Sequence, residues 1–216
     1  MKRIIALIVF LALVFGISAC EPTICPPPEN NSYDFENAEE LRAFFTEEEA
    51  KKHEGEFAGF ISEMAKDTSK LKIPYLSGEP LALRNRGEGY SNITLLESEL
   101  YGRPWIWFYC INSGGEVIIR TTYLNGDEAK GLSASEFIKK IAPDAPNIDN
   151  FKSYENYKNV YEKEINVSEN QISALVCEMS DSEQIYVFLI YEDMLVIIRA
   201  NAEYLGEDFF AELSFA

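Results

Sequence analysis

Apart from its carboxylates, this chain has few side chains that could act as acids, bases, nucleophiles or metal ligands. It has one histidine and four cysteines against 36 aspartates and glutamates. A serine or cysteine nucleophile normally needs a histidine as its base, and His53 lies in the charged run 51–54, which is typical of a solvated helix position. Zinc sites draw on several histidines and cysteines. The sequence therefore predicts no nucleophilic triad, no metal site and no cofactor.

Carboxylate chemistry needs a selected pair of acids, and the sequence selects none. Glycosidases use two facing carboxylates, whereas the strand glutamates here are expected on polar strand faces. Residues 144–150 offer oxygen ligands in a loop, but their spacing does not fit a calcium-binding EF-hand, so we interpret them as a linker. A hydrolase with paired acids is the least favoured function. We therefore expect a protein that is not an enzyme.

Two aromatic strips are the remaining signal. Trp105, Trp107 and Tyr109 alternate along one predicted strand and share a face, while the residues between them are also apolar. A second strip has spacings of three and four, which predicts a helix. Core packing is the default for both strips, but an exposed strip would bind a saccharide, peptide or protein, because rigid aromatic rings supply large contact areas. The candidate ligand-binding residues are Trp105, Trp107, Tyr109, Tyr154, Tyr157 and Tyr161.

The N-terminus carries a targeting pattern. Lys2 and Arg3 precede an apolar run over residues 4–17, which is shorter than the roughly 20 residues of a spanning helix and fits a signal peptide. The run ends in Ile17-Ser18-Ala19-Cys20, which resembles the lipobox of bacterial lipoproteins. That resemblance implies that Cys20 receives a diacylglycerol and becomes the new N-terminus of a membrane-anchored, extracytoplasmic protein. The alternatives are a plain signal peptide and a short anchor helix.

These features predict four segments. Residues 1–19 are the signal peptide, and residues 20–34 are the lipidated cysteine with a proline-rich tether. Residues 35–145 hold the N-terminal helices and a first sheet unit, and residues 146–216 hold a second unit and a final helix. Loss of two basic residues with the signal peptide takes the net charge from −17 to about −19. That charge opposes binding to nucleic acid and to an anionic membrane surface.

Cysteine usage leaves a question open. Cys25, Cys110 and Cys177 remain after Cys20, and disulfides are permitted outside the cytoplasm. A bridge between Cys110 and Cys177 is one alternative. The other is that both are free and behave as small apolar residues inside strands, and the absence of a CxxC pair argues against a redox motif.

Helical signals concentrate in the N-terminal third. The spacings Asn37/Glu40 and Thr46/Glu49 both fit a capping box. Phe57, Phe60, Ile61 and Met64 follow at helical spacing and should face a core. A break is expected near residue 55, which is a glycine.

An internal repeat organises the rest. Segment 91–120 aligns with segment 170–199 without a gap and with nine identities, including Val117–Arg120 with Val196–Arg199. A rival alignment pairs Cys110 with Cys177 but scores fewer identities in the strands. Short turns favour antiparallel hairpins. The predicted fold is α+β, in the order α-ββββ-α-ββββ-α, with strands over residues 81–84, 93–100, 105–112 and 116–124, then 160–165, 171–178, 184–191 and 195–201, and helices over 57–70, 133–141 and 206–214.

The sequence thus predicts a membrane-anchored extracytoplasmic lipoprotein. We expect a non-catalytic binding module for an envelope, saccharide or protein ligand. The alternative is a structural or assembly factor of the cell envelope that acts through protein–protein contact.

Overall fold

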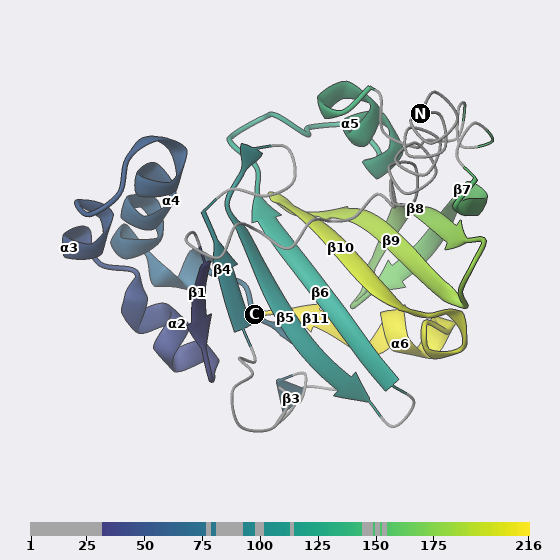
Figure 1. The fold of residues 1–216 in the computed structure, drawn as a ribbon, viewed down its shortest axis with the longest axis horizontal. Helices are drawn as coiled ribbons and strands as arrows, with labels where there is room; N and C mark the ends of the chain where they lie inside the picture. Colours follow the sequence, from purple (N-terminus) through teal and green to yellow (C-terminus); the bar gives the residue numbers. More distant parts are fainter. Residues whose placement is uncertain are drawn as a thin grey trace, which may run out of the picture.

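A large antiparallel sheet dominates the computed structural model, which describes residues 32–76, 79–80, 93–97, 102–112, 115–143, 149, 152 and 155–216. Its eight strands run in the order β1-β4-β5-β6-β10-β9-β8-β7 (Figure 1). A small sheet of order β11-β2-β3 adds three short strands. The strands are β1 Ser32–Phe35, β2 Pro74–Leu76, β3 Glu79–Pro80, β4 Ile93–Leu96, β5 Trp105–Asn112, β6 Gly115–Tyr123, β7 Tyr157–Val167, β8 Asn170–Met179, β9 Gln184–Tyr191, β10 Met194–Asn201 and β11 Leu213–Phe215. Helices and a mainly antiparallel sheet confirm the α+β class.

Three of the described helices, α2, α3 and α5, begin at a side-chain cap, and the first two of these caps were predicted from the sequence. Asn37 and Thr46 accept from the backbone N–H three residues on, at 2.9 and 3.0 Å. Ser133 and Glu136 form the full reciprocal box at the start of α5. Gly55, at φ +65°, begins α4 and marks the expected break. The helices are α2 Ala38–Phe44, α3 Glu47–Ala50, α4 Gly55–Lys66, α5 Ala134–Ile141 and α6 Glu207–Glu212, with 3-10 turns at Thr68–Lys70 and Ala202–Tyr204.

The two faces of the large sheet have different covers. One face packs against α2, α3, α4, α6 and the small sheet in a single large core that holds the expected Phe57, Ile61 and Met64. The opposite face packs against α5 through Phe137 and Ile138. Figure 1 shows α2, α3 and α4 gathered beside β1 and β4, with α5 lying apart from them. The sheet is therefore the middle layer of the molecule.

The observed element order differs from the predicted one at the N-terminal half. The strand expected over residues 81–84 lies outside the described residues, and β1 occupies the edge position beside β4. The helix expected over residues 57–70 ends at Lys66 and continues as a separate 3-10 turn. Pairing of β1 with β4 is non-local, and local periodicity carries no information about such pairing.

Two hairpins begin at positions that the predicted alignment of 91–120 with 170–199 equates. The strand pair β5–β6 begins at Trp105 and Gly115, and the pair β9–β10 begins at Gln184 and Met194. In contrast, Ile93 of β4 lies opposite Phe108, whereas Val176 of β8 occupies the corresponding place opposite Val187. The ungapped alignment places Ile172 there, so β8 is displaced by four residues from β4. An even displacement keeps the inward side chains inward.

The second aromatic strip is not helical. Tyr157 and Tyr161 lie in β7, so the interpretation from three- and four-residue spacing is wrong for them. Tyr154 lies outside the described residues. Within the described part of the chain, no helix is long and apolar enough to cross a membrane. Cys20 and the tether up to residue 31 also lie outside it.

Candidate functional site

The aromatic residues of β5 lie on the sheet face that α5 covers in part. Trp105 is fully buried against the α5 core, whereas Trp107 and Tyr109 are half-buried. The Trp107 and Tyr109 ring centres lie 5.8 Å apart. The Arg120 guanidinium carbon lies 3.8 Å from the Trp107 ring centre, which is a cation–π contact. Trp107 also packs against the core that contains Phe137 and Ile138, so the strip runs from the buried Trp105 to the half-buried Tyr109.

The register of the sheet adds aromatic residues from the other hairpin to this strip. One row across the sheet runs through Trp107, Arg120, Ile197 and Phe188, which lie opposite one another on neighbouring strands. The adjacent row on the same face runs through Tyr109, Ile118, Arg199 and Tyr186. Across the four strands β5, β6, β10 and β9, each row thus has an aromatic residue at both ends and one arginine between them. We call the six polar and aromatic members the aromatic face: Trp107, Tyr109, Arg120, Tyr186, Phe188 and Arg199.

Exposure differs among the members of the aromatic face. Tyr186 and Phe188 are half-buried, like Trp107 and Tyr109. Arg199 keeps 28% of its side chain exposed and lies 3.8 Å from the Glu116 carboxylate. Arg120 is buried. The sequence analysis missed Tyr186 and Phe188, although two signals were available: their alternation along β9, and the repeat alignment that equates them with Trp107 and Tyr109.

The tyrosines of β7 do not form a common strip. Tyr157 packs against the small cluster beneath α5, whereas Tyr161 packs against the large core on the opposite face. Burial, together with the nearby Glu178 carboxylate, raises the pKa of Tyr161. The two described tyrosines of the second predicted strip therefore pack against two different cores and do not form one surface.

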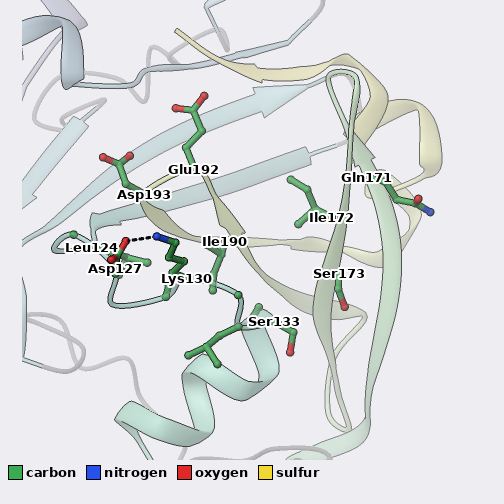
Figure 2. Close-up of a pocket in the computed structure, with 15 residues that line it drawn as sticks. Leu124, Asp127, Lys130, Ser133, Gln171, Ile172, Ser173, Ile190, Glu192 and Asp193 are labelled. Carbon is green, nitrogen blue, oxygen red and sulfur yellow. Dashed lines mark hydrogen bonds and ion pairs between the residues drawn. The ribbon is translucent and has the colours of Figure 1, made fainter.

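A cleft of about 590 Å³ opens where the start of α5 meets the ends of three strands. Figure 2 shows Glu192 and Asp193 projecting from the β9–β10 turn, with Ser133 at the helix start and Ile190 between them. Lys130 pairs with Asp127 at 3.1 Å across the loop before α5. None of the sequence-predicted aromatic residues lines this cleft.

A second cleft, of about 400 Å³, adjoins the first and shares Leu124, Gly126 and Asp193 with it. It continues toward α4, where Glu63 pairs with Lys70 at 2.9 Å. Both clefts are rich in carboxylates, and the lysines that line them are already paired with acids. Sequence reasoning missed them because their walls come from segments that are far apart in the chain.

The single histidine has an environment unlike the predicted solvated one. His53 joins α3 to α4 with its side chain only 10% exposed. Its Nδ1 lies 3.2 Å from a Glu97 carboxylate oxygen, and its Nε2 lies 3.2 Å from a Glu49 oxygen. The Tyr33 hydroxyl donates to the same Glu97 oxygen at 3.1 Å. Both ring nitrogens thus face carboxylates, an arrangement that positions no serine or cysteine nucleophile for activation.

The partners of His53 have shifted titration behaviour of their own. Burial and the hydrogen bond to Glu97 raise the pKa of Tyr33 to about 12, so its hydroxyl remains a donor at neutral pH. The hydrogen bond from Lys52 lowers the pKa of Glu49 below its ordinary value. The Lys52 Nζ atom lies 2.6 Å from a Glu49 carboxylate oxygen. The cluster therefore combines charged donors and acceptors around a nearly buried ring.

The remaining chemical candidates are structural in their surroundings. Cys177 is free and 3% exposed, and burial raises its pKa to about 12, which suppresses the nucleophilic thiolate. In the loop considered for calcium, Asp149 is described, and its carboxylate pairs with Lys139. No group of three or more potential metal-ligating side chains comes together among the residues that the structure describes.

No family model and no curated protein matches this sequence.

Proposed function

We propose that this protein is a lipid-anchored extracytoplasmic binding module that carries out no reaction. Cys20 at the end of the lipobox is the lipid attachment point, and the proline-rich tether separates it from the domain. Two or three acyl chains hold a protein durably at a membrane, whereas one chain binds only reversibly. The described domain begins with β1, whose first three residues, Ser32–Asp34, overlap the end of the tether expected over residues 20–34. The signal sequence supports the extracytoplasmic location.

The aromatic face is the proposed binding surface, and its half-buried rings are the observation that carries the proposal. Four aromatic side chains from two strands lie beside two arginines on one face of a rigid sheet. Rings fixed on strands offer apolar contact area with little loss of conformational entropy. Arginine adds planar hydrogen-bond donors. A saccharide ring or an extended peptide suits such a surface, because both combine apolar faces with hydrogen-bonding edges.

We further propose that the two central hairpins descend from one duplicated unit. At positions that the repeat alignment equates, their strands pair in the same register: Ile106 lies opposite Thr121, and Ile185 lies opposite Ala200. Ile119 and Ile198, which the alignment also equates, lie opposite each other where β6 meets β10. This symmetric pairing supports a duplication, and it makes the aromatic face a surface with two related halves.

The binding proposal is tested by retention of envelope material. Wild-type protein immobilised in detergent is compared with Trp107→Ala and with Tyr204→Ala, a half-buried tyrosine outside the aromatic face. We expect one class of envelope saccharide or peptide to be retained by the wild type and by Tyr204→Ala. The Trp107→Ala variant should retain roughly tenfold less or worse, as expected for loss of a central aromatic contact. Equal retention by all three proteins would contradict the binding surface.

The anchor is tested separately. Mass spectrometry of protein from a bacterial membrane should show an acylated N-terminal Cys20, and a Cys20→Ser variant should lose the acyl mass. An unmodified Cys20 in the wild type would contradict the anchor without affecting the binding result.

The envelope assembly factor is the alternative function. If it is correct, the immobilised wild-type protein should retain a protein subunit and no saccharide. The carboxylate-rich clefts at α5 and α4 favour this alternative if the retained subunit is basic and binding weakens in salt. Loss of retention in Trp107→Ala distinguishes the binding-module proposal from it.

A further inference from the structure

We propose that His53 is the centre of a pH-sensitive latch that holds edge strand β1 on the domain. The latch is closed while the imidazole carries two protons, and it weakens when the ring loses one. This device concerns the attachment of the tether to the fold, so it goes beyond the proposed binding function and does not depend on it.

The geometry joins three elements through one ring. Tyr33 lies in β1, Glu49 in α3, and Glu97 directly after β4. The Nε2 and Nδ1 atoms of His53 each lie 3.2 Å from a carboxylate oxygen, of Glu49 and Glu97 respectively. The Tyr33 hydroxyl oxygen lies 3.1 Å from the same Glu97 oxygen and 3.5 Å from Nδ1. Strand β1 is thereby tied to the end of its neighbour β4 and to the helical layer.

Only the doubly protonated ring donates a hydrogen bond to both carboxylates. An imidazolium donates from both nitrogens, whereas neutral imidazole donates from one and presents a lone pair at the other. With carboxylate oxygens at both positions, a neutral ring places an acceptor against an acceptor on one side. His53 is 10% exposed, so water relieves that contact poorly.

The groups that face the ring from the surrounding elements favour the cation. Strand β1 contributes Tyr33, α3 contributes Glu49, and the end of β4 contributes Glu97; α4 contributes the apolar ring of Phe57, in an edge contact at 4.9 Å. Lys52 is the nearby positive charge, and it pairs with the other oxygen of Glu49. Two carboxylates against one partly offset lysine leave a net negative charge around the ring.

The direction of the pH effect follows from these contacts. The latch is closed while the ring holds both protons. When rising pH removes one of them, one of the two charged hydrogen bonds is lost. Strongly acidic solution also opposes the latch, because a protonated carboxyl group no longer attracts an imidazolium.

Strand β1 is the element that depends most on such a latch. It pairs with β4 through only four residues, from Ser32 opposite Leu96 to Phe35 opposite Ile93. Its release would add these four residues to the tether, roughly 3.3 Å each when extended. It would also uncover the edge of β4, an unpaired strand edge that can accept another strand.

Hydrogen–deuterium exchange of the full-length protein in detergent tests the latch, with β7 as the internal reference strand. After correction for the intrinsic pH dependence of exchange, the protection of β1 relative to β7 should fall about tenfold as the ring loses a proton, the size expected for one charged hydrogen bond. Because the chain contains one histidine, ¹⁵N NMR of the imidazole reports its protonation without ambiguity. The loss of β1 protection should follow that titration.

Two variants separate the latch from simple packing. His53→Gln keeps a side chain able to donate and accept but cannot gain a charge, so its β1 protection should not change with pH over the same range. Glu97→Gln keeps the size of its side chain and should reduce the pH response, and it serves if His53→Gln fails to fold. Protection of β1 that is independent of pH in the wild type would overturn the latch. An equal pH response in a folded variant would do so as well.

Discussion

The two edges of the large sheet are held in different ways. Strand β7 has eleven residues, precedes β8 in a hairpin with a turn at Ser168 and Glu169, and pairs with it at ten positions. Strand β1 has four residues, and the whole segment 36–92 separates it from β4. Closing a long loop costs more entropy than closing a two-residue turn. The β7 edge is thus secured by its own backbone, whereas the β1 edge relies on side chains such as Tyr33 and His53.

The two central strands of the sheet, β6 and β10, are alike, although the two edge strands differ. Ile119 and Ile198 are both fully buried and lie opposite each other between β6 and β10. The central hairpins β5–β6 and β9–β10 thus form a common frame for the sheet, while the two outer strands, β1 and β7, are held by different contacts.

The largest expected effect comes from this common frame. Ile119→Ala and Ile198→Ala should each lower the free energy of unfolding by about 2–5 kcal/mol, because each removes buried methyl groups and leaves a cavity. The two losses should agree within about 1 kcal/mol if the halves are equivalent at their centre. Urea denaturation monitored by circular dichroism measures both. A loss confined to one variant would break the likeness between the two hairpins.

The next largest effect is a pH dependence of stability caused by the thiol of Cys177. This residue lies in β8, the strand that pairs with β7. Burial raises the pKa of this thiol to about 12, against 9.0 for an ordinary thiol. Between these values the unfolded chain releases a proton that the folded chain retains, so stability is unaffected below about pH 9 and falls as the pH rises above it. At about pH 10 the wild type should lose roughly 1.4 kcal/mol relative to Cys177→Ala, as expected for one pH unit. Equal pH dependence of the two unfolding curves would contradict the burial of the thiol.

The hydroxyl of Tyr33 provides a smaller test of the β1 edge. Tyr33→Phe removes the hydrogen bond to Glu97 and should cost about 1 kcal/mol. Amide exchange should accelerate in β1 and not in β7. The matched change at the other edge, Tyr161→Phe, should leave β1 unaffected. Faster exchange in β7 on substitution of Tyr33 would mean that the two edges open together.

The smallest effect on stability is expected at the aromatic face. Trp107→Phe should cost less than Tyr33→Phe, because it keeps an apolar ring at a half-buried position. Acrylamide should then quench the remaining fluorescence poorly, since Trp105 is fully buried. The reciprocal Trp105→Phe variant should leave emission that acrylamide quenches well. Equal quenching would mean that α5 covers both tryptophans to the same degree.

Much of the fold could be predicted because its signals are local. The apolar strand over Trp105–Asn112, caps at Asn37 and Thr46, and the helical spacing of Phe57, Ile61 and Met64 all appear in the structure as expected. The aromatic strip of β5 was predicted for the same reason. The strip expected near Tyr157 failed because spacings of three and four also occur by chance in a strand that buries residues on both faces.

The site depends more on non-local contacts. Tyr186 and Phe188 join Trp107 and Tyr109 only through the pairing of β6 with β10, and the larger cleft gathers the loop before α5, the start of β8 and the β9–β10 turn. His53 looks solvated from its charged neighbours in sequence, yet Tyr33 and Glu97 enclose it from strands on either side of the helical segment.

By itself the sequence determined the targeting pattern expected to end at Cys20, the acidic charge, the class of the fold and which strand residues share a face. These properties depend on residue type and on spacing over a few positions. Only the tertiary structure decided that β1 fills an edge of the sheet, that His53 lies between two carboxylates, and that aromatic residues from two hairpins share one face. The physical reason is that backbone pairing and burial between distant segments depend on the packing of the whole chain, which no local pattern specifies.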